Sequence, residues 1–161
     1  MYRRVWAPRG KTPLAWVRPR YRWPYVCGFV RPSTGESAFW LLPTVNAVAF
    51  LEVLRRFARL RGAWVGKLLP VVLDRAGWHV SGRVEVPEGV RLVFLPPYSP
   101  ELQPVERVWP LVNEAVANRY FRDLEEMMEV VAERCRVRAQ DPETLRRHTL
   151  YYWWPRMRES A

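Results

Sequence analysis

The sequence predicts an α/β protein whose mixed sheet is flanked by helices. A pair of short strands is followed by an amphipathic helix and then by two short apolar runs. Strand, helix and strand in this order imply a crossover connection that packs helices on a sheet. The length of 161 residues and the hydrophobic content of 49% suit one compact domain with its own core.

The first two strands are predicted at residues 25–30 and 38–42. The sequence RPSTGE separates them, and its Pro32 and Gly35 can supply the dihedral angles of a tight turn. We therefore expect an antiparallel hairpin.

A helix is predicted after the hairpin. Thr44 or Asn46 can cap its start and Gly62 its end. Its apolar side chains recur at helical spacing and should cover a sheet. They are Phe50, Leu51, Leu54, Phe57 and Ala58.

Two further strands are predicted at residues 68–73 and 90–95, where nearly continuous apolar runs are typical of strands buried on both faces. Another helix is expected to begin near Asp123, a suitable N-cap. Its packing stripe comprises Leu124, Met127, Met128, Val131 and Cys135.

The formal charge of +10 and the pI near 10.4 favour a polyanionic partner such as nucleic acid. Arginines scattered over a solvated surface explain the same charge equally well. No apolar run reaches the roughly 20 residues of a membrane span, and the basic N-terminus lacks an apolar segment behind it. We expect a soluble, cytoplasmic bacterial protein associated with the nucleoid.

Other site chemistries have little support in the sequence. Cys27 and Cys135 are isolated, without the spacing of a zinc site, and read as buried free thiols. His79 and His148 lie beside no Ser or Cys nucleophile with an orienting group, which disfavours acyl transfer.

Two acidic residues stand where a metal-dependent nuclease would need them. Asp74 follows the strand predicted at 68–73, and ligands bind at the carboxyl ends of strands in such sheets. Glu106 follows a proline-rich loop that restricts the chain before a metal binds. Each acid alone is better explained by a helix cap or a helix dipole, whereas the pair with its loop favours catalysis.

The segment between residues 71 and 109 resembles the catalytic core of mariner-type and related bacterial insertion-sequence transposases, the superfamily named for its Asp, Asp, Glu metal triad. The residues that carry the resemblance are Asp74, Arg75, Ala76, Gly77, Trp78 and His79, then 95–102, Pro104, Glu106 and Trp109. The resemblance extends over residues 4–135 and implies a ribonuclease-H-like fold.

The resemblance also places the first Asp of the triad before Met1, because RRVWAPRG at residues 3–10 matches a later family segment. We therefore expect a chain that is missing its first central strand, either truncated or frameshifted. Two acids make a weak metal site, and unpaired strand edges favour association. A partner polypeptide carrying the strand, or a homo-oligomer, is expected to complete the protein.

The function implied is DNA transposition by a metal-dependent endonuclease and strand-transfer domain. Asp74 and Glu106 would be the catalytic residues and would hold Mg²⁺ or Mn²⁺. Arg75, His79 and Arg107 are candidate DNA contacts, and a purely structural role explains them equally well. The alternatives are a noncatalytic DNA-binding remnant, an inhibitory subunit of an intact transposase, or a structural protein that oligomerises through its tail.

Two regions are expected, a partial catalytic domain at residues 1–135 and an aromatic, basic extension packed on it at 136–161. The aromatic run at residues 151–154 is expected to serve core or interface packing more than base stacking. Pro110 should kink or delay the helix that bears Glu106.

Overall fold

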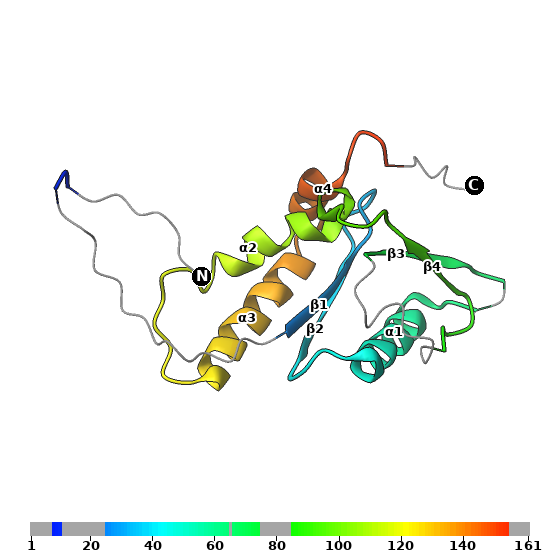
Figure 1. Cartoon of the computed structure of the whole chain (residues 1–161), viewed down its shortest axis with the longest axis horizontal. Coiled ribbons are helices and arrows are strands. Elements are labelled where there is room, and N and C mark those ends of the chain that lie inside the picture. The colour runs from blue at the N-terminus through cyan, green and yellow to red at the C-terminus, as the bar shows by residue number, and fades with distance from the viewer. Residues whose placement is uncertain (1–7, 11–24, 65, 75–84, 155–161) are drawn as a thin grey trace.

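A β-hairpin lies between a single helix on one side and the helices of the C-terminal half on the other (Figure 1). The computed structural model describes residues 8–10, 25–64, 66–74 and 85–154. Strands β1 (Tyr25–Val30) and β2 (Ser37–Leu42) pair antiparallel throughout their length. Gly35 in the connecting turn has φ of 77°, a conformation that favours glycine. The predicted hairpin is confirmed.

Helix α1 (Ala47–Arg61) follows the hairpin. Of the two predicted caps the structure uses Asn46, whose side chain accepts a hydrogen bond from the backbone N–H of Ala49 at 2.9 Å. The helix ends as predicted at Gly62, which has φ of 60°. Its buried residues are Phe50, Val53, Leu54, Phe57 and Ala58.

Strands β3 (Leu69–Leu73) and β4 (Val90–Phe94) form a parallel pair. Val71 is buried, but Pro70 is exposed and Val93 is 42% exposed. The predicted burial of these strands on both faces is therefore wrong. Among the described residues, α1 covers one face and no helix covers the other, so the apolar run reflects β propensity as well as burial.

The described strands form two ladders, antiparallel β1 with β2 and parallel β3 with β4, so both strand directions of the predicted mixed sheet are present, in two separate pairs. Both ladders contribute to one apolar core. Phe29 and Ala38 of the hairpin and Val71 and Leu73 of β3 pack with the buried face of α1. Helix α1 therefore covers both ladders.

The other face of the hairpin is covered by the helices that follow β4 (Figure 1). These elements are η1 (Pro100–Leu102), η2 (Pro104–Arg107), α2 (Trp109–Asn113), α3 (Leu124–Ala139) and α4 (Pro142–Thr149). Their buried side chains form a second core, which comprises Val108, Val112, Val116, Phe121, Met127, Val131, Cys135 and Leu145. The hairpin is thus the middle layer between two apolar cores.

Helix α3 begins where the sequence predicts, because the Asp123 side chain accepts a hydrogen bond from Glu126 N at 2.9 Å. The helix continues through residue 135, so the catalytic and C-terminal regions expected from the sequence share one helix. In the described ranges, none of the helices is both long and apolar enough to cross a bilayer.

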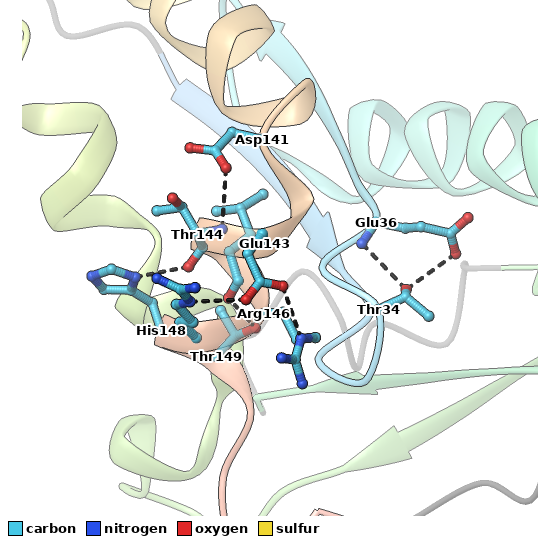
Figure 2. Close-up of polar contacts among 10 residues, drawn as sticks. Thr34, Glu36, Asp141, Glu143, Thr144, Arg146, His148 and Thr149 are labelled. Carbon is cyan, nitrogen blue, oxygen red and sulfur yellow. Dashed lines mark hydrogen bonds and ion pairs between the residues drawn. The ribbon is translucent and has the colours of Figure 1, made fainter.

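Helix α4 is capped by Asp141, whose carboxylate accepts a hydrogen bond from Thr144 N at 3.1 Å (Figure 2). Hydrogen bonds from Thr144 are the main reason that the pKa of Asp141 lies below its usual range, and the positive charge of Arg138 adds to this effect. The helix packs beside the β1–β2 turn, so it is attached to the hairpin as well as to α3.

Candidate active site

Asp74 lies at the carboxyl end of β3, half-buried. The backbone N–H of Leu95 donates to the carbonyl of Leu73 at 2.8 Å, which extends the β3–β4 ladder by one bond. Asp74 therefore lies beside the start of the loop that leads to Glu106. This position is the one at which side chains of parallel strands meet ligands.

The loop after β4 is restricted by its prolines and by local hydrogen bonds. Gln103 N donates to Pro100 O at 2.9 Å, and Glu106 N donates to Gln103 O at 3.0 Å. Gln103 is itself buried. Tyr98 has a left-handed backbone, with φ of 58°, and its side chain is fully exposed. The loop thus places Glu106 in η2 by short 3₁₀ turns.

Glu106 precedes the α-helix and does not lie in it. Helix α2 begins at Trp109, and Pro110 occupies its first turn, where a missing N–H costs least. The predicted kink or delay of the helix by Pro110 stays a prediction. The exposed Glu106 is followed one turn later by Trp109, whose indole Nε1 donates to Glu106 Oε1 at 3.2 Å.

The indole of Trp109 lies against Gly28 in β1. A Cβ atom at Gly28 would be 2.8 Å from Trp109 Cη2 and 3.0 Å from Phe39 Cδ1. This position therefore leaves room for the ring only because it has no side chain. The contact attaches the segment that carries Glu106 to the hairpin.

The C-terminal segment contacts the same loop from another side. The hydroxyl of Tyr151 donates to the carbonyl of Glu101 at 2.8 Å, and the guanidinium of Arg107 lies 4.1 Å from the centroid of the Tyr151 ring. Arg107 Nη1 also donates to the carbonyl of His148 at 3.5 Å. Tyr151 is buried, as the packing interpretation of the tail predicts, whereas Tyr152 is exposed.

The sequence predicted five site residues, and the structure describes three of them. Asp74 ends one ladder, Glu106 lies in η2 next to β1, and Arg107 is directed to Tyr151. Arg75 and His79 lie outside the described residues. Gly28, Trp109 and Tyr151, which position the loop, were not identified as site residues from the sequence.

The donor chemistry of Asp74 and Glu106 suits Mg²⁺ or Mn²⁺, because carboxylate oxygens are the hard ligands that these ions prefer. Within the described ranges, no group of three His, Cys, Asp or Glu residues could hold a metal. A metal site at Asp74 and Glu106 therefore stays a prediction.

A family model described as DDE superfamily endonuclease matches residues 1–128. The "Uncharacterized protein y4pE/y4sA" of Sinorhizobium fredii (strain NBRC 101917 / NGR234) is 38% identical over 107 residues, which are 66% of this chain and 78% of that protein.

A solved structure, "Crystal structure of the Mos1 Strand Transfer Complex", superposes with a TM-score of 0.55 at 17% identity. The match covers 95% of this chain and 51% of that one, so the chain spans about half the length of its structural relative. At this identity the likeness concerns the fold, which is ribonuclease-H-like as predicted.

Proposed function

The chain belongs to the DDE superfamily of endonucleases, and from this premise we propose that it is a catalytic domain for DNA transposition, cutting and joining DNA with a divalent metal. The observation that carries the proposal is the placement of the two acids. Asp74 ends the β3–β4 ladder, and Glu106 lies in an element that contacts β1 of the other ladder. We propose that their carboxylates converge between the two ladders.

A third acid is proposed to enter on an added strand. Among the described residues, β1 pairs only with β2 and β3 only with β4, so each ladder offers an edge for another strand. A strand from a partner polypeptide or a second copy would join the ladders into one sheet. An acid on that strand would complete the triad.

The residues of the chain would have different roles in the reaction. Asp74 and Glu106 would bind Mg²⁺ or Mn²⁺, which when bound supplies a nucleophile at neutral pH and stabilises charge on the phosphate. Arg75, His79 and Arg107 would orient the scissile phosphate. The net charge of +10 would draw DNA to the protein, because each neutralised phosphate releases counterions.

The test is Mg²⁺-dependent nicking of supercoiled DNA. The full chain is assayed alone and together with the polypeptide encoded directly upstream of Met1. Asp74→Ala and Glu106→Gln should abolish nicking, whereas Glu101→Gln, which changes an exposed acid of the same loop, should not. Nicking that survives Asp74→Ala, or that needs no metal, would refute the catalytic assignment.

A second candidate is a noncatalytic subunit that binds DNA or inhibits an intact transposase. It is favoured because, among the described residues, no three His, Cys, Asp or Glu side chains lie together in a group that could hold a metal ion. This function predicts DNA binding that weakens with salt, no cleavage under any of the conditions above, and inhibition when the chain is mixed with an active transposase. A chain that merely oligomerises would show no salt-dependent affinity for DNA.

A further inference from the structure

We propose that Trp109 is the positioning residue for Glu106 and that Gly28, by lacking a side chain, leaves the space that the indole ring of Trp109 occupies. This inference rests on the proposed function, because it concerns how the metal-binding carboxylate is oriented. It concerns residues other than the two acids.

The first support is the hydrogen bond from Trp109 Nε1 to Glu106 Oε1, 3.2 Å long. The indole N–H can only donate, so its partner must be an acceptor such as a carboxylate oxygen. Glu106 is exposed and has a long side chain that would otherwise sample several rotamers. The bond holds Oε1, so Oε2 would be the oxygen available to a metal ion.

The second support is the fit of the indole against β1. Gly28 lies within a strand, where a glycine weakens the strand unless another group approaches closely. Here a Cβ atom would stand 2.8 Å from Trp109 Cη2, which is too close without movement of the ring. The ring is therefore fixed by the hairpin, and through its N–H it fixes the carboxylate.

The decisive variant is Trp109→Phe, which keeps an aromatic ring against Gly28 and removes the N–H. Mn²⁺ binding is measured by calorimetry on the complete protein, with its partner polypeptide where one is required, and nicking is measured over a range of Mn²⁺ concentrations. Loss of a group that orients a metal ligand commonly costs 10–100-fold in affinity or activity. We expect Mn²⁺ to bind about tenfold more weakly and saturating Mn²⁺ to restore most of the nicking rate.

A double substitution tests whether Trp109 acts through Glu106. In a Glu106→Gln background, Trp109→Phe should change Mn²⁺ affinity no further, because the carboxylate that it orients is already absent. Additive losses in the double variant would overturn the inference, since they would indicate a separate role for the indole.

Gly28→Ala provides a second approach that leaves Trp109 and Glu106 intact. The added methyl group should displace the ring and weaken Mn²⁺ binding in the same direction. Trp64→Phe is the matched control, because Trp64 is 61% exposed and lies near Gly89 at the opposite end of β4. This control should bind Mn²⁺ as the unaltered protein does.

Thermal melts of each variant distinguish a loss of folding from a displacement of the indole ring and the Glu106 carboxylate in a folded protein. If Trp109→Phe does not fold, Gly28→Ala decides the question by the same Mn²⁺ titration. Suppose that Glu106→Gln weakens Mn²⁺ binding but that folded Trp109→Phe, or folded Gly28→Ala where Trp109→Phe does not fold, binds Mn²⁺ as the unaltered protein does. This result would overturn the inference and leave the proposed function intact. A complete protein that neither binds Mn²⁺ nor nicks DNA would overturn the proposed function itself.

Discussion

The guanidinium of Arg107 lies over the ring of Tyr151, 4.1 Å from its centroid. Tyr151 makes two further contacts. Its ring stacks on Trp153, and its hydroxyl donates to the carbonyl of Glu101. One side chain from the C-terminal segment therefore contacts both ends of the short stretch that carries Glu106. The tail is joined to the candidate site through these contacts.

Removing the Tyr151 hydroxyl should loosen that stretch. Tyr151→Phe leaves the carbonyl of Glu101 without this donor, and we expect the free energy of unfolding to fall by about 1 kcal/mol. Urea denaturation measures the change. Tyr152→Phe is the matched control, because its side chain is 99% exposed, and it should leave stability unchanged. Equal effects of the two substitutions would contradict the role given to Tyr151.

Gly35 should tolerate no side chain. A Cβ atom there would lie 1.8 Å from the carbonyl oxygen of Pro142, and the residue has φ of 77°. We expect Gly35→Ala to destabilise the protein by about 3 kcal/mol, from the left-handed backbone and the clash together.

Gly62→Ala separates these two causes. Gly62 also has positive φ, but its nearest neighbour to an added Cβ is the flexible end of Lys67 at 3.8 Å. Its substitution should cost about 1 kcal/mol, the backbone contribution alone. Thermal denaturation compares the two, and a similar loss for both would show that the turn can move away from α4, which Figure 2 shows beside it.

Local patterns were sufficient to predict most of the fold. The hairpin, α1 with its two caps and α3 with Asp123 were all specified by residues close together in the sequence. The family resemblance, confirmed by the match over residues 1–128, supplied the ribonuclease-H-like fold. The burial of β3 and β4 was overestimated, because an apolar run does not indicate how many helices cover it.

The candidate site was predicted only in part, for a physical reason. Asp74 and Glu106 stand out because their chemistry is evident from residue type and context. Gly28 contacts Trp109, which is 81 residues away in the sequence, and Tyr151 contacts Glu101, which is 50 residues away. No local sequence pattern reveals such contacts. The spacing of Trp109 three residues after Glu106 was the one signal that could have indicated a contact.

Cys135 should make stability depend on alkaline pH. Burial raises the pKa of its thiol from 9.0 to about 11. The folded protein therefore holds this proton more tightly than the unfolded chain does, so the stability is present in full below pH 9 and is lost as pH rises toward 11. The unfolding free energy should fall by up to about 1.4 kcal/mol per pH unit for this group.

The measurement is urea denaturation between pH 8 and 11, compared with Cys135→Ala. The variant lacks the thiol, so its stability should decline less steeply over the same range, whatever the packing change does to its absolute value. Iodoacetamide at pH 8 should also leave Cys135 unmodified until the chain unfolds, since only the thiolate reacts. Parallel stability curves, or alkylation of the folded protein, would show that the thiol is accessible.

Arg134 should support the short helix that contains Trp109. Its Nε donates to the carbonyl of Leu111 at 2.9 Å, and its Nη2 donates to Glu114 Oε2 at 3.1 Å. Helix α2 has only five residues, too few to be stable alone, so this arginine satisfies a carbonyl near the helix end. We expect Arg134→Met to lower the unfolding free energy by about 2 kcal/mol.

The same substitution should also affect the candidate site, because a displaced α2 carries Trp109 away from Glu106. Weaker Mn²⁺ binding should therefore accompany the loss of stability in Arg134→Met. Arg136→Met is the matched control on α3, since Arg136 is 60% exposed and its partners among the described contacts, Glu133 and Gln140, lie within α3 or at its end. An exposed pair of this kind contributes little, so the control should bind Mn²⁺ normally. If both variants bind Mn²⁺ normally, α2 does not depend on α3 for the orientation of Trp109.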